Sequence, residues 1–284
     1  MQKFSVVIPA KDEELGLKTL LPELRAVLTE DSEIIVVNDG STDSTSAVCE
    51  ENSVTQIIHP YSKGNGASIK AGARIAKGEY LIFMDGDGQH APEDIRKLIA
   101  RLDDGYDLVV GARTKDSQAS LARSVANSFY NRFASFVTGH KISDLTSGFR
   151  VVRADKFREF LYLLPNGFSY PTTSTMAFFR AGYSVSFEEI TANAREGKSH
   201  INIVKDGVRF LLIIFKVGTL YSPLKVFFPI SLLAMLSGLG WYGYTLISFS
   251  RFTNMSALLM STSLIIFLMG LISEQITSLL YKDS

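Results

Sequence analysis

Short apolar runs alternate with amphipathic segments along the first two thirds of the chain. The apolar runs are bounded by Gly, Pro, Asn or Asp, which is typical of buried strands. The segments between them carry apolar residues at helical spacing; between Glu13 and Leu28 these residues are Leu15, Leu17, Leu20, Leu21, Leu24, Val27 and Leu28. The predicted strands are 4–8, 33–37, 54–58, 80–84, 107–110, a short strand after 148, and 184–190; the predicted helices are 13–28, 43–52, 67–76, the stretch after 92, 120–141, a helix from 155, and 171–181.

This alternation of strand and helix, with short connections, predicts an α/β fold with a Rossmann-like, mostly parallel sheet and helices on both faces. In such sheets ligands bind outside the carboxyl ends of the strands. Acidic, basic and glycine residues gather at those predicted ends, which are 9–13, 39, 63–66, 85–89 and 111–113. The sequence therefore predicts one ligand-binding site along the edge of the sheet where these strands end, called the binding rim below.

The last third of the chain has a different pattern. Residues 226–249 and 255–273 contain no charged side chain. As a helix the first of these stretches would be about 36 Å long, enough to cross a bilayer core of roughly 30 Å. With a short link between them, the two predict a transmembrane hairpin. The predicted organisation is a catalytic domain at 1–200, an amphipathic juxtamembrane segment at 201–225, and two membrane helices within 226–284.

Basic residues are unevenly distributed around the predicted spans. Lys205, Arg209, Lys216 and Lys225 precede the first span, whereas Arg251 stands alone in the link. By the positive-inside bias, the domain before the hairpin is expected in the cytoplasm, in a multi-pass membrane protein. Glycines at 238, 240 and 243 are compatible with packing of the hairpin against a neighbouring copy, which would make a homo-oligomer.

Composition narrows the functional class further. The 29 basic and 29 acidic residues cancel, so no global charge favours nucleic acid as a partner. Cys49 is the single cysteine, which excludes an internal disulfide and suits a reducing compartment. The slightly positive mean hydropathy arises from the two uncharged stretches near the end of the chain.

The stretch from Tyr80 to Pro92 carries the strongest chemical signal. Its sequence, YLIFMDGDGQHAP, is an apolar run that ends in Asp85 and Asp87. Two carboxylates at one strand end repel each other, so a hard divalent cation such as Mg²⁺ or Mn²⁺ is expected between them, and such ions usually carry phosphates. A plain hairpin turn is the alternative, but residues typical of a helix start follow, rather than a second strand.

Two other segments leave their roles open. In the loop KGNG, Gly64 and Gly66 precede a helix, and either a turn that caps the helix or a ligand contact would explain them. The later loop NAREGKSH sets basic side chains among small residues, so it could fold over an anion.

Six segments resemble, in order and spacing, the motifs of family 2 glycosyltransferases with a GT-A fold. They are VVIPAKDEE, VNDGSTD, MDGDGQHAPEDI, GAR, DLTSGFR and REGKSH, and the resemblance covers about residues 4 to 200. It is greatest to the group of dolichol-phosphate mannosyltransferases and polyprenyl-phosphate glycosyltransferases. Asn65 departs from the group, in which a lysine is common at this place.

The resemblance implies a role for each matching residue. The donor nucleotide sugar would be held by Pro9, Ala10, Glu13, Asp39, Asp85, Arg195 and Lys198. A Mg²⁺ or Mn²⁺ ion that bridges the donor diphosphate would be held by Asp85, Asp87 and Gln89. The phosphate of the lipid acceptor would be bound by Arg113, Arg123 and Asn127, and the catalytic set would be Asp87, Arg113 and Arg123.

The expected reaction is transfer of a hexose from GDP-mannose, UDP-glucose or UDP-N-acetylglucosamine to a dolichyl or undecaprenyl phosphate, with inversion at the anomeric carbon. The phosphate acceptor is already largely anionic at neutral pH and needs no general base. Two other functions stay open. One is a family 2 transferase with a sugar hydroxyl acceptor, although its QxxRW segment is missing and Trp241 lies within a predicted span. The other is a non-catalytic membrane scaffold that binds nucleotide sugar.

Overall fold

The computed structural model describes residues 3–114, 121–167, 169–190, 215–216 and 218–280, without the side chains of 121–126 and 280. The chain divides into two compact units. The first comprises Met1–Arg132 and Lys141–Ile201, and the second comprises Phe133–His140 and Asn202–Ser284.

The first unit is built on a seven-stranded sheet with the order β3-β2-β1-β4-β6-β5-β7. All its strands run parallel except β6, which pairs antiparallel with both β4 and β5. The mostly parallel α/β fold predicted from the sequence is confirmed, with β6 as the exception. The strands are β1 (Phe4–Ala10), β2 (Ser32–Asn38), β3 (Thr55–Ile58), β4 (Tyr80–Phe83), β5 (Leu108–Arg113), β6 (Arg150–Arg153) and β7 (Val185–Ile190).

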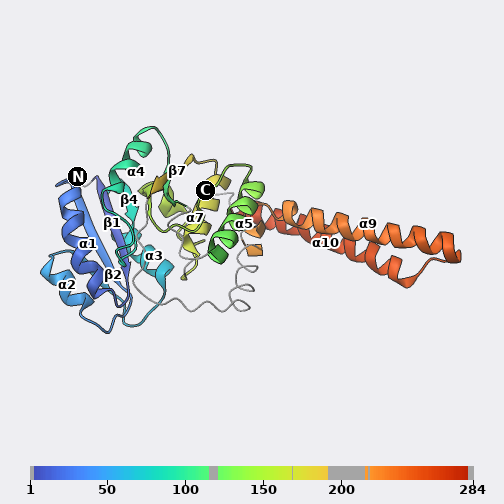
Figure 1. Cartoon of the computed structure of the whole chain (residues 1–284), viewed down its shortest axis with the longest axis horizontal. Helices are drawn as coiled ribbons and strands as arrows, with labels where there is room; N and C mark the ends of the chain where they lie inside the picture. The colour runs from blue at the N-terminus through green and yellow to red at the C-terminus, as the bar shows by residue number, and fades with distance from the viewer. Residues whose placement is uncertain (1–2, 115–120, 168, 191–214, 217, 281–284) are drawn as a thin grey trace. The chain divides into compact units, whose positions relative to one another are not determined.

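Helices cover both faces of this sheet (Figure 1). In the first unit they are α1 (Glu14–Val27), α2 (Thr45–Glu51), α3 (Asn65–Ile75), α4 (Asp94–Asp103), α6 (Ala154–Glu159) and α7 (Tyr170–Arg180), and α5 (Leu121–Thr138) crosses the boundary between the units. The observed elements begin and end within a few residues of the predicted ones, as expected for helix and strand boundaries.

The core follows from the alternation of side chains along β1. Val6 and Ile8 lie on one face and join the buried leucines of α1, which were predicted from their helical spacing, and apolar residues of α4. Burying each leucine contributes about 1.5–3 kcal/mol. Val7 points to the opposite face, where α3 approaches so closely that a Cβ on Gly72 would lie 2.3 Å from Cγ1 of Val7. Gly72 therefore allows α3 to lie against the sheet.

The single cysteine belongs to this core. Cys49 lies on α2 with no exposed surface, among the apolar residues that fill the space between the sheet, α1 and α2. Burial raises the pKa of its thiol to about 11, so the thiol stays protonated at neutral pH.

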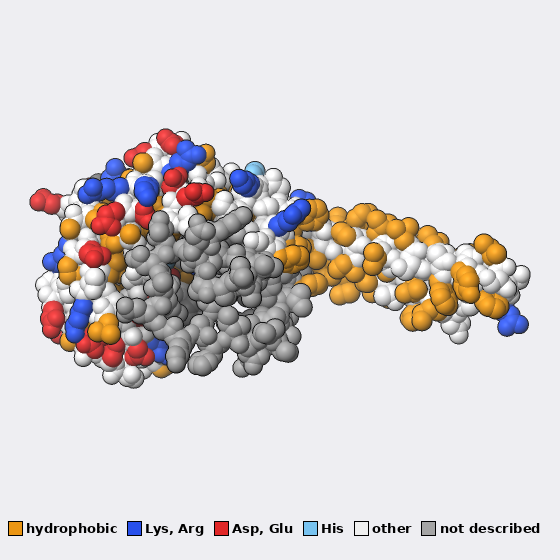
Figure 2. Space-filling view, in the orientation of Figure 1, with side chains coloured by type: hydrophobic (Ala, Val, Ile, Leu, Met, Phe, Trp, Pro, Cys, Tyr) orange, Lys and Arg blue, Asp and Glu red, His pale blue; other side chains and the backbone are white. Residues whose placement is uncertain are grey.

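The second unit is dominated by a hairpin of two long helices, α9 (Pro223–Phe249) and α10 (Asn254–Leu280). Both are long and apolar enough to cross a membrane. Figure 2 shows their surface covered mainly by hydrophobic side chains, while charged side chains crowd the surface of the first unit. The two spans predicted from the sequence are thus present, and α9 and α10 each extend over 27 residues, past the uncharged stretches 226–249 and 255–273.

Small and polar residues form the seam between these helices. The hydroxyl of Ser231 donates to the carbonyl of Ser263 at 2.9 Å, and the hydroxyl of Ser263 donates to the carbonyl of Ser231 at 2.7 Å. Farther along, a Cβ on Gly238 would lie 3.1 Å from Cβ of Leu259. Reciprocal hydrogen bonds and close backbone approach are the usual means of joining helices in lipid, where apolar contact alone gives little preference.

A half-buried polar contact also joins the two helices at the open end of the hairpin. The carboxylate of Glu274 on α10 accepts a hydrogen bond from the backbone N–H of Leu224 at 3.2 Å. The first N–H groups of a helix lack partners within the helix. Glu274 therefore acts as a cap for α9, which explains an acidic residue near the end of an otherwise uncharged span.

Candidate active site

A cavity of about 500 Å³ opens at the carboxyl ends of β1, β2 and β4. Because these neighbouring strands run parallel, their ends meet at one edge of the sheet. The lining residues come from the end of β1, from the segments that follow β1, β2, β3 and β4, and from the start of α3: Pro9, Ala10, Lys11, Glu13, Asp39, Ser62, Gly64, Asn65, Ser68, Asp85, Gly86, Asp87 and Gln89.

The cavity brings together most of the residues expected on the donor and metal side. Pro9, Ala10, Glu13, Asp39, Asp85, Asp87 and Gln89 all line it. Arg113 and the half-buried Asn127 do not line it. Arg195 and Lys198 lie outside the described residues, as does the side chain of Arg123. Lys11 lies within the predicted binding rim but had no assigned role, whereas Ser62 and Ser68 lie outside the predicted strand ends.

Four hydrogen bonds from the segment after β3 hold the carboxylate of Asp39 in place. Its carboxylate accepts hydrogen bonds from Nδ1 of His59 at 2.7 Å, from Oγ of Ser62 at 2.8 Å, and from the backbone N–H groups of Lys63 and Gly64, both at 2.8 Å. Burial alone would raise the pKa of Asp39, but these donors outweigh it and lower the pKa to about 2. The carboxylate is therefore ionised at neutral pH and fixes the course of the loop from 59 to 64 beside the cavity.

The charge of the cavity lining is strongly negative. Four carboxylates, those of Glu13, Asp39, Asp85 and Asp87, face a single ammonium group, that of Lys11. A nucleoside diphosphate is itself an anion, so it would be repelled by this lining. A divalent cation at Asp85 and Asp87 would remove the conflict.

The set of oxygen donors fits such an ion. In the part of the chain that the structure describes, no three Asp, Glu, His or Cys side chains converge as a complete metal cage. Mg²⁺ does not need one, because it is usually bound through one or two carboxylates plus phosphate and water oxygens. Asp85, Asp87 and the amide of Gln89, beside an open cavity, provide the protein's share of such a site.

The KGNG loop leads directly into α3 and also borders the cavity. Asn65 begins α3 and also lines the cavity, where its Oδ1 is buried with no hydrogen-bond partner among the described residues. The glycines have a packing role. A Cβ on Gly64 would lie 2.5 Å from the carbonyl oxygen of Asn166, and one on Gly66 would lie 2.1 Å from that of Pro165.

His90 of the DGDGQH motif is a packing residue in this structure. Its ring is buried and stacks on Phe149 of the SGFR motif, with the ring centres 5.1 Å apart. Burial lowers the pKa of His90 to about 4, so the imidazole is neutral at physiological pH. The stacking joins two motifs that are about 60 residues apart in the chain.

Arg113, at the end of β5, is held by an acidic partner. Its Nε and Nη2 donate to the carboxylate of Asp144 at 2.8 and 3.1 Å, and Nη2 also donates to Oγ1 of Thr146 at 2.7 Å. Burial would lower the pKa of the guanidinium, but the hydrogen bonds and charge of Asp144 outweigh it and raise the pKa. The cation is thus fixed in direction at the same edge of the sheet as the cavity, since β5 runs parallel to β4.

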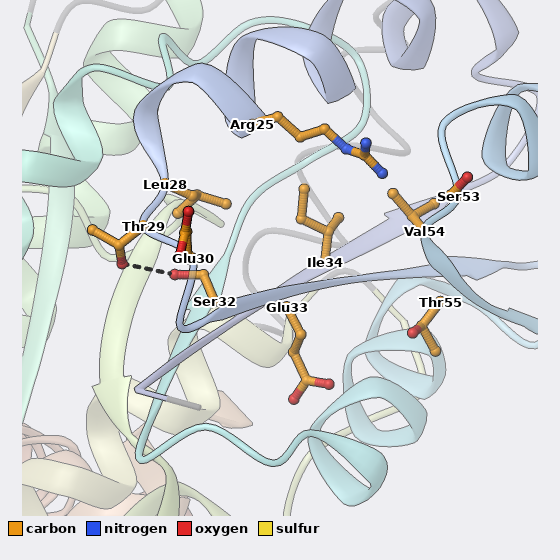
Figure 3. A pocket seen from close by; sticks show the side chains of 10 residues that line it. All are labelled: Arg25, Leu28, Thr29, Glu30, Ser32, Glu33, Ile34, Ser53, Val54 and Thr55. Atoms are coloured by element: carbon orange, nitrogen blue, oxygen red, sulfur yellow. Dashed lines mark hydrogen bonds between the residues drawn. The ribbon is translucent and has the colours of Figure 1, made fainter. Parts of the chain in front are cut away.

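A second cavity, of about 550 Å³, lies beside the amino ends of β2 and β3 (Figure 3). Two of its charged side chains, those of Arg25 and Glu33, already have partners. Arg25 donates to the carbonyl of Asn52, and the carboxylate of Glu33 accepts from Oγ of Ser5 and from the N–H of Lys77, each at 2.6 Å. These groups stabilise the fold, and the cavity lies at the edge opposite to the clustered carboxylates.

Comparison with known proteins assigns the family. The model of glycosyl transferase family 2 matches residues 5–161, and that of the GtrB C-terminal hairpin matches residues 222–279. The chain therefore belongs to glycosyl transferase family 2, with a GtrB-type hairpin after the catalytic fold, as the motifs predicted.

Two relatives are named undecaprenyl-phosphate 4-deoxy-4-formamido-L-arabinose transferase. The protein from Photorhabdus laumondii subsp. laumondii is 34% identical over 54% of this chain and 50% of its own length. The one from Proteus mirabilis is 35% identical over 54% and 49%. The chain thus matches about half the length of these relatives. Glycosyltransferase AglJ of Haloferax volcanii is 26% identical over 87% of this chain and 85% of its own.

Solved structures support the fold. Glucosyl-3-phosphoglycerate synthase from Mycobacterium tuberculosis, crystallised with Mn²⁺, UDP-glucose and phosphoglyceric acid, matches with a TM-score of 0.62. The match covers 76% of this chain and 80% of that one at 16% identity. This likeness confirms the GT-A fold.

Proposed function

We propose that the protein is a membrane-bound inverting glycosyltransferase that moves a hexose from a nucleotide diphosphate sugar to a polyprenyl phosphate. The observation that carries the proposal is the occurrence, in one chain, of a carboxylate-lined cavity at the strand ends and a hairpin of membrane-spanning length. The first serves a water-soluble phosphate donor, and the second suits a lipid acceptor. The names of the two undecaprenyl-phosphate transferases support the same pairing.

The donor would lie in the cavity with its nucleoside near Pro9, Ala10 and the loop that Asp39 organises. Its diphosphate would reach Asp85, Asp87 and Gln89, which hold Mg²⁺ or Mn²⁺. When bound, this ion supplies Lewis-acid stabilisation of the charge on the departing diphosphate. Asp85 and Asp87 act on the leaving group only, and neither serves as nucleophile or base. Arg195 and Lys198 would contribute further positive charge to the donor phosphates.

The acceptor would approach from the side of β5. A polyprenyl phosphate has a second pKa near 6, so at neutral pH it is already a competent nucleophile. The task left to the protein is to bring two anions together. Arg113, oriented by Asp144, would bind the acceptor phosphate together with Arg123 and Asn127. A single displacement then inverts the anomeric configuration, giving a β-linked product from an α-linked donor.

The hairpin would keep this site at the membrane surface. The positive-inside bias favours the cytoplasmic side for the catalytic unit, because four basic residues precede the uncharged stretch of α9: Lys205, Arg209, Lys216 and Lys225. The amphipathic stretch from 201 to 225 would lie at the headgroup level. The proposed donors are GDP-mannose, UDP-glucose and UDP-N-acetylglucosamine, and the proposed acceptors are undecaprenyl and dolichyl phosphate.

The test is a transfer assay with the purified full chain in detergent. Radiolabelled UDP- and GDP-sugars are each incubated with undecaprenyl or dolichyl phosphate, with Mg²⁺, with Mn²⁺ or with EDTA. We expect label in the lipid for one donor, its loss in EDTA, and its loss in Asp87→Ala. A covalent glycosyl-enzyme, an α-linked product, or label in a sugar oligomer instead of the lipid would overturn the proposal.

A further inference from the structure

The turn that leads into β6 lies directly against a carboxylate of the candidate metal site. A Cβ built on Gly148 would lie 2.8 Å from Oδ2 of Asp85 and 3.4 Å from its Oδ1 and Cγ. The nearest atoms to that Cβ thus all belong to the carboxylate of Asp85. Gly148 shows no positive φ, so its small size, rather than its backbone freedom, is what the contact requires.

Two buried side chains also donate hydrogen bonds to the backbone of this turn. The hydroxyl of Tyr170 donates to the carbonyl of Gly148 at 3.1 Å, and the guanidinium of Arg150 donates to the carbonyl of Ser147. Tyr170 is 2% exposed, and Arg150 is not exposed at all. The two carbonyls that flank the contact with Asp85 are therefore fixed by buried donors.

Arg150 in turn is anchored to the start of α7. Its Nη1 donates to the carbonyl of Pro171 at 2.9 Å, to Oγ of Ser174 at 2.8 Å and to Oγ1 of Thr175 at 3.2 Å. Within the described residues, no carboxylate lies at ion-pair distance from this fully buried cation. A buried charge without a counter-ion is costly, so its hydrogen bonds through Nη1 and Nη2 have to compensate, while its buried Nε has no partner among the described residues. The result is a rigid support under the turn.

We propose that Gly148, with Tyr170 and Arg150 behind it, positions the carboxylate of Asp85 for the metal and the donor diphosphate. Gly148 is a positioning residue: it sets the direction of Asp85 and touches neither substrate. The assignment rests on the proposed function, because it assumes that Asp85 holds a metal ion and the donor diphosphate. It gives the SGFR motif a role on the donor side of the reaction.

The rigidity of the turn determines what a larger residue would do. Because buried donors hold the turn, an added methyl group is expected to displace the carboxylate of Asp85 rather than the turn. The end of a side chain moves at a lower cost than a buried backbone turn, so the fold is expected to survive while the orientation of the ligand changes. Changes that disturb the orientation of metal ligands typically reduce metal affinity by about 10- to 100-fold.

The experiment measures binding by the full chain in detergent. Mn²⁺ affinity in the presence of UDP or GDP is determined by titration calorimetry and by the electron paramagnetic resonance signal of free Mn²⁺. Gly148→Ala is expected to weaken Mn²⁺ binding by about 10- to 100-fold. Gly167→Ala is the matched control, because a Cβ there would meet nothing within 4 Å.

Two further variants address folding. Tyr170→Phe removes only the hydroxyl that holds the turn and is expected to weaken Mn²⁺ binding several-fold, with an unchanged circular dichroism spectrum. In a cycle with Asp85→Ala, any loss of Tm caused by Gly148→Ala should disappear in the double variant, because the atoms that the methyl group meets are gone.

The outcomes separate the two proposals. If the wild type binds no Mn²⁺ with either nucleotide, the metal-dependent function fails. If the wild type binds and Gly148→Ala binds equally well, the positioning role fails. If Gly148→Ala does not fold, unchanged Mn²⁺ binding by Tyr170→Phe, or a Tm loss that persists without the Asp85 carboxylate, overturns it.

Discussion

The guanidinium of Arg113 and the carboxylate of Asp144 form a two-point hydrogen-bonded pair at the end of β5. The carboxylate is 5% exposed, while the arginine keeps 29% of its side-chain surface accessible. Such a geometry fixes the plane of the guanidinium and leaves part of it free for a second anion. Asp144 is therefore the residue that orients the proposed acceptor-binding cation, although it would not itself meet the acceptor.

The first prediction concerns this pair. Asp144→Asn should raise the KM for polyprenyl phosphate by about tenfold, since the amide retains the size of the side chain but loses one charge-assisted hydrogen bond. Nucleotide binding should be unchanged. Asp107→Asn is the matched control, because Asp107 is paired with Lys156 at 2.5 Å at the start of β5, the opposite edge of the sheet. Equal effects of the two variants on KM would argue against an orienting role.

The second prediction concerns acid stability. The pKa of Asp39 is lowered from 3.8 to about 2 in the folded protein, so the unfolded chain binds the proton more readily. The stability that Asp39 contributes, about 2 kcal/mol, is thus complete above about pH 5 and is lost as the pH falls through about 2. Asp39→Asn should flatten this part of the stability curve, as measured by urea unfolding followed by far-UV circular dichroism. Superimposable curves for wild type and variant would contradict the prediction.

The third prediction concerns the seam of the hairpin. Ser263→Leu removes the hydrogen bond from the Ser263 hydroxyl to the carbonyl of Ser231 and adds bulk at a position that is 1% exposed, so it should destabilise the hairpin by about 1–3 kcal/mol. Ser261→Leu is the control, since Ser261 is exposed and donates only to the carbonyl of Leu258 in its own helix. Trp241, the single tryptophan, reports on α9 during unfolding in SDS. No difference between the two variants would show that the serine pair is dispensable.

The fourth prediction concerns the hairpin as a whole. Deleting residues 226–284 should impair transfer to long-chain acceptors much more than binding of the nucleotide, because the donor cavity lies in the first unit. The cut retains Lys225, whose Nζ donates to the carbonyl of Val137 at 2.8 Å. Calorimetric titration of UDP and GDP, set beside transfer to short- and long-chain phosphates, distinguishes the cases. Equal loss of both functions would mean that the hairpin is needed for folding.

The fold could be predicted from the sequence because its signals are local. The apolar runs and the helical spacing in α1 depend only on neighbouring residues, and parallel strands bring their carboxyl ends together. The position of β6 could not be predicted in this way. Its insertion between β4 and β5, in the opposite direction, depends on pairing with strands far away in the chain.

For the same reason, only part of the candidate site could be predicted from the sequence. Asp85 and Asp87 stand out because two acids follow one strand. The partners of Asp39 do not, since His59 and Ser62 become neighbours only when the loop folds back. Likewise, the contact between Gly148 and Asp85 joins residues about 60 positions apart, and no spacing rule indicates it.

The buried thiol of Cys49 makes the native chain nearly inert toward maleimides at neutral pH. A cysteine introduced elsewhere would then be the only reactive site, without prior removal of the natural one. Lys18→Cys and Arg251→Cys would place such a site on α1 and in the hairpin link, both exposed. In sealed vesicles of known orientation, an impermeant maleimide would label the two from opposite sides if the hairpin spans the bilayer. The same pair of labels would reveal which side the catalytic unit occupies.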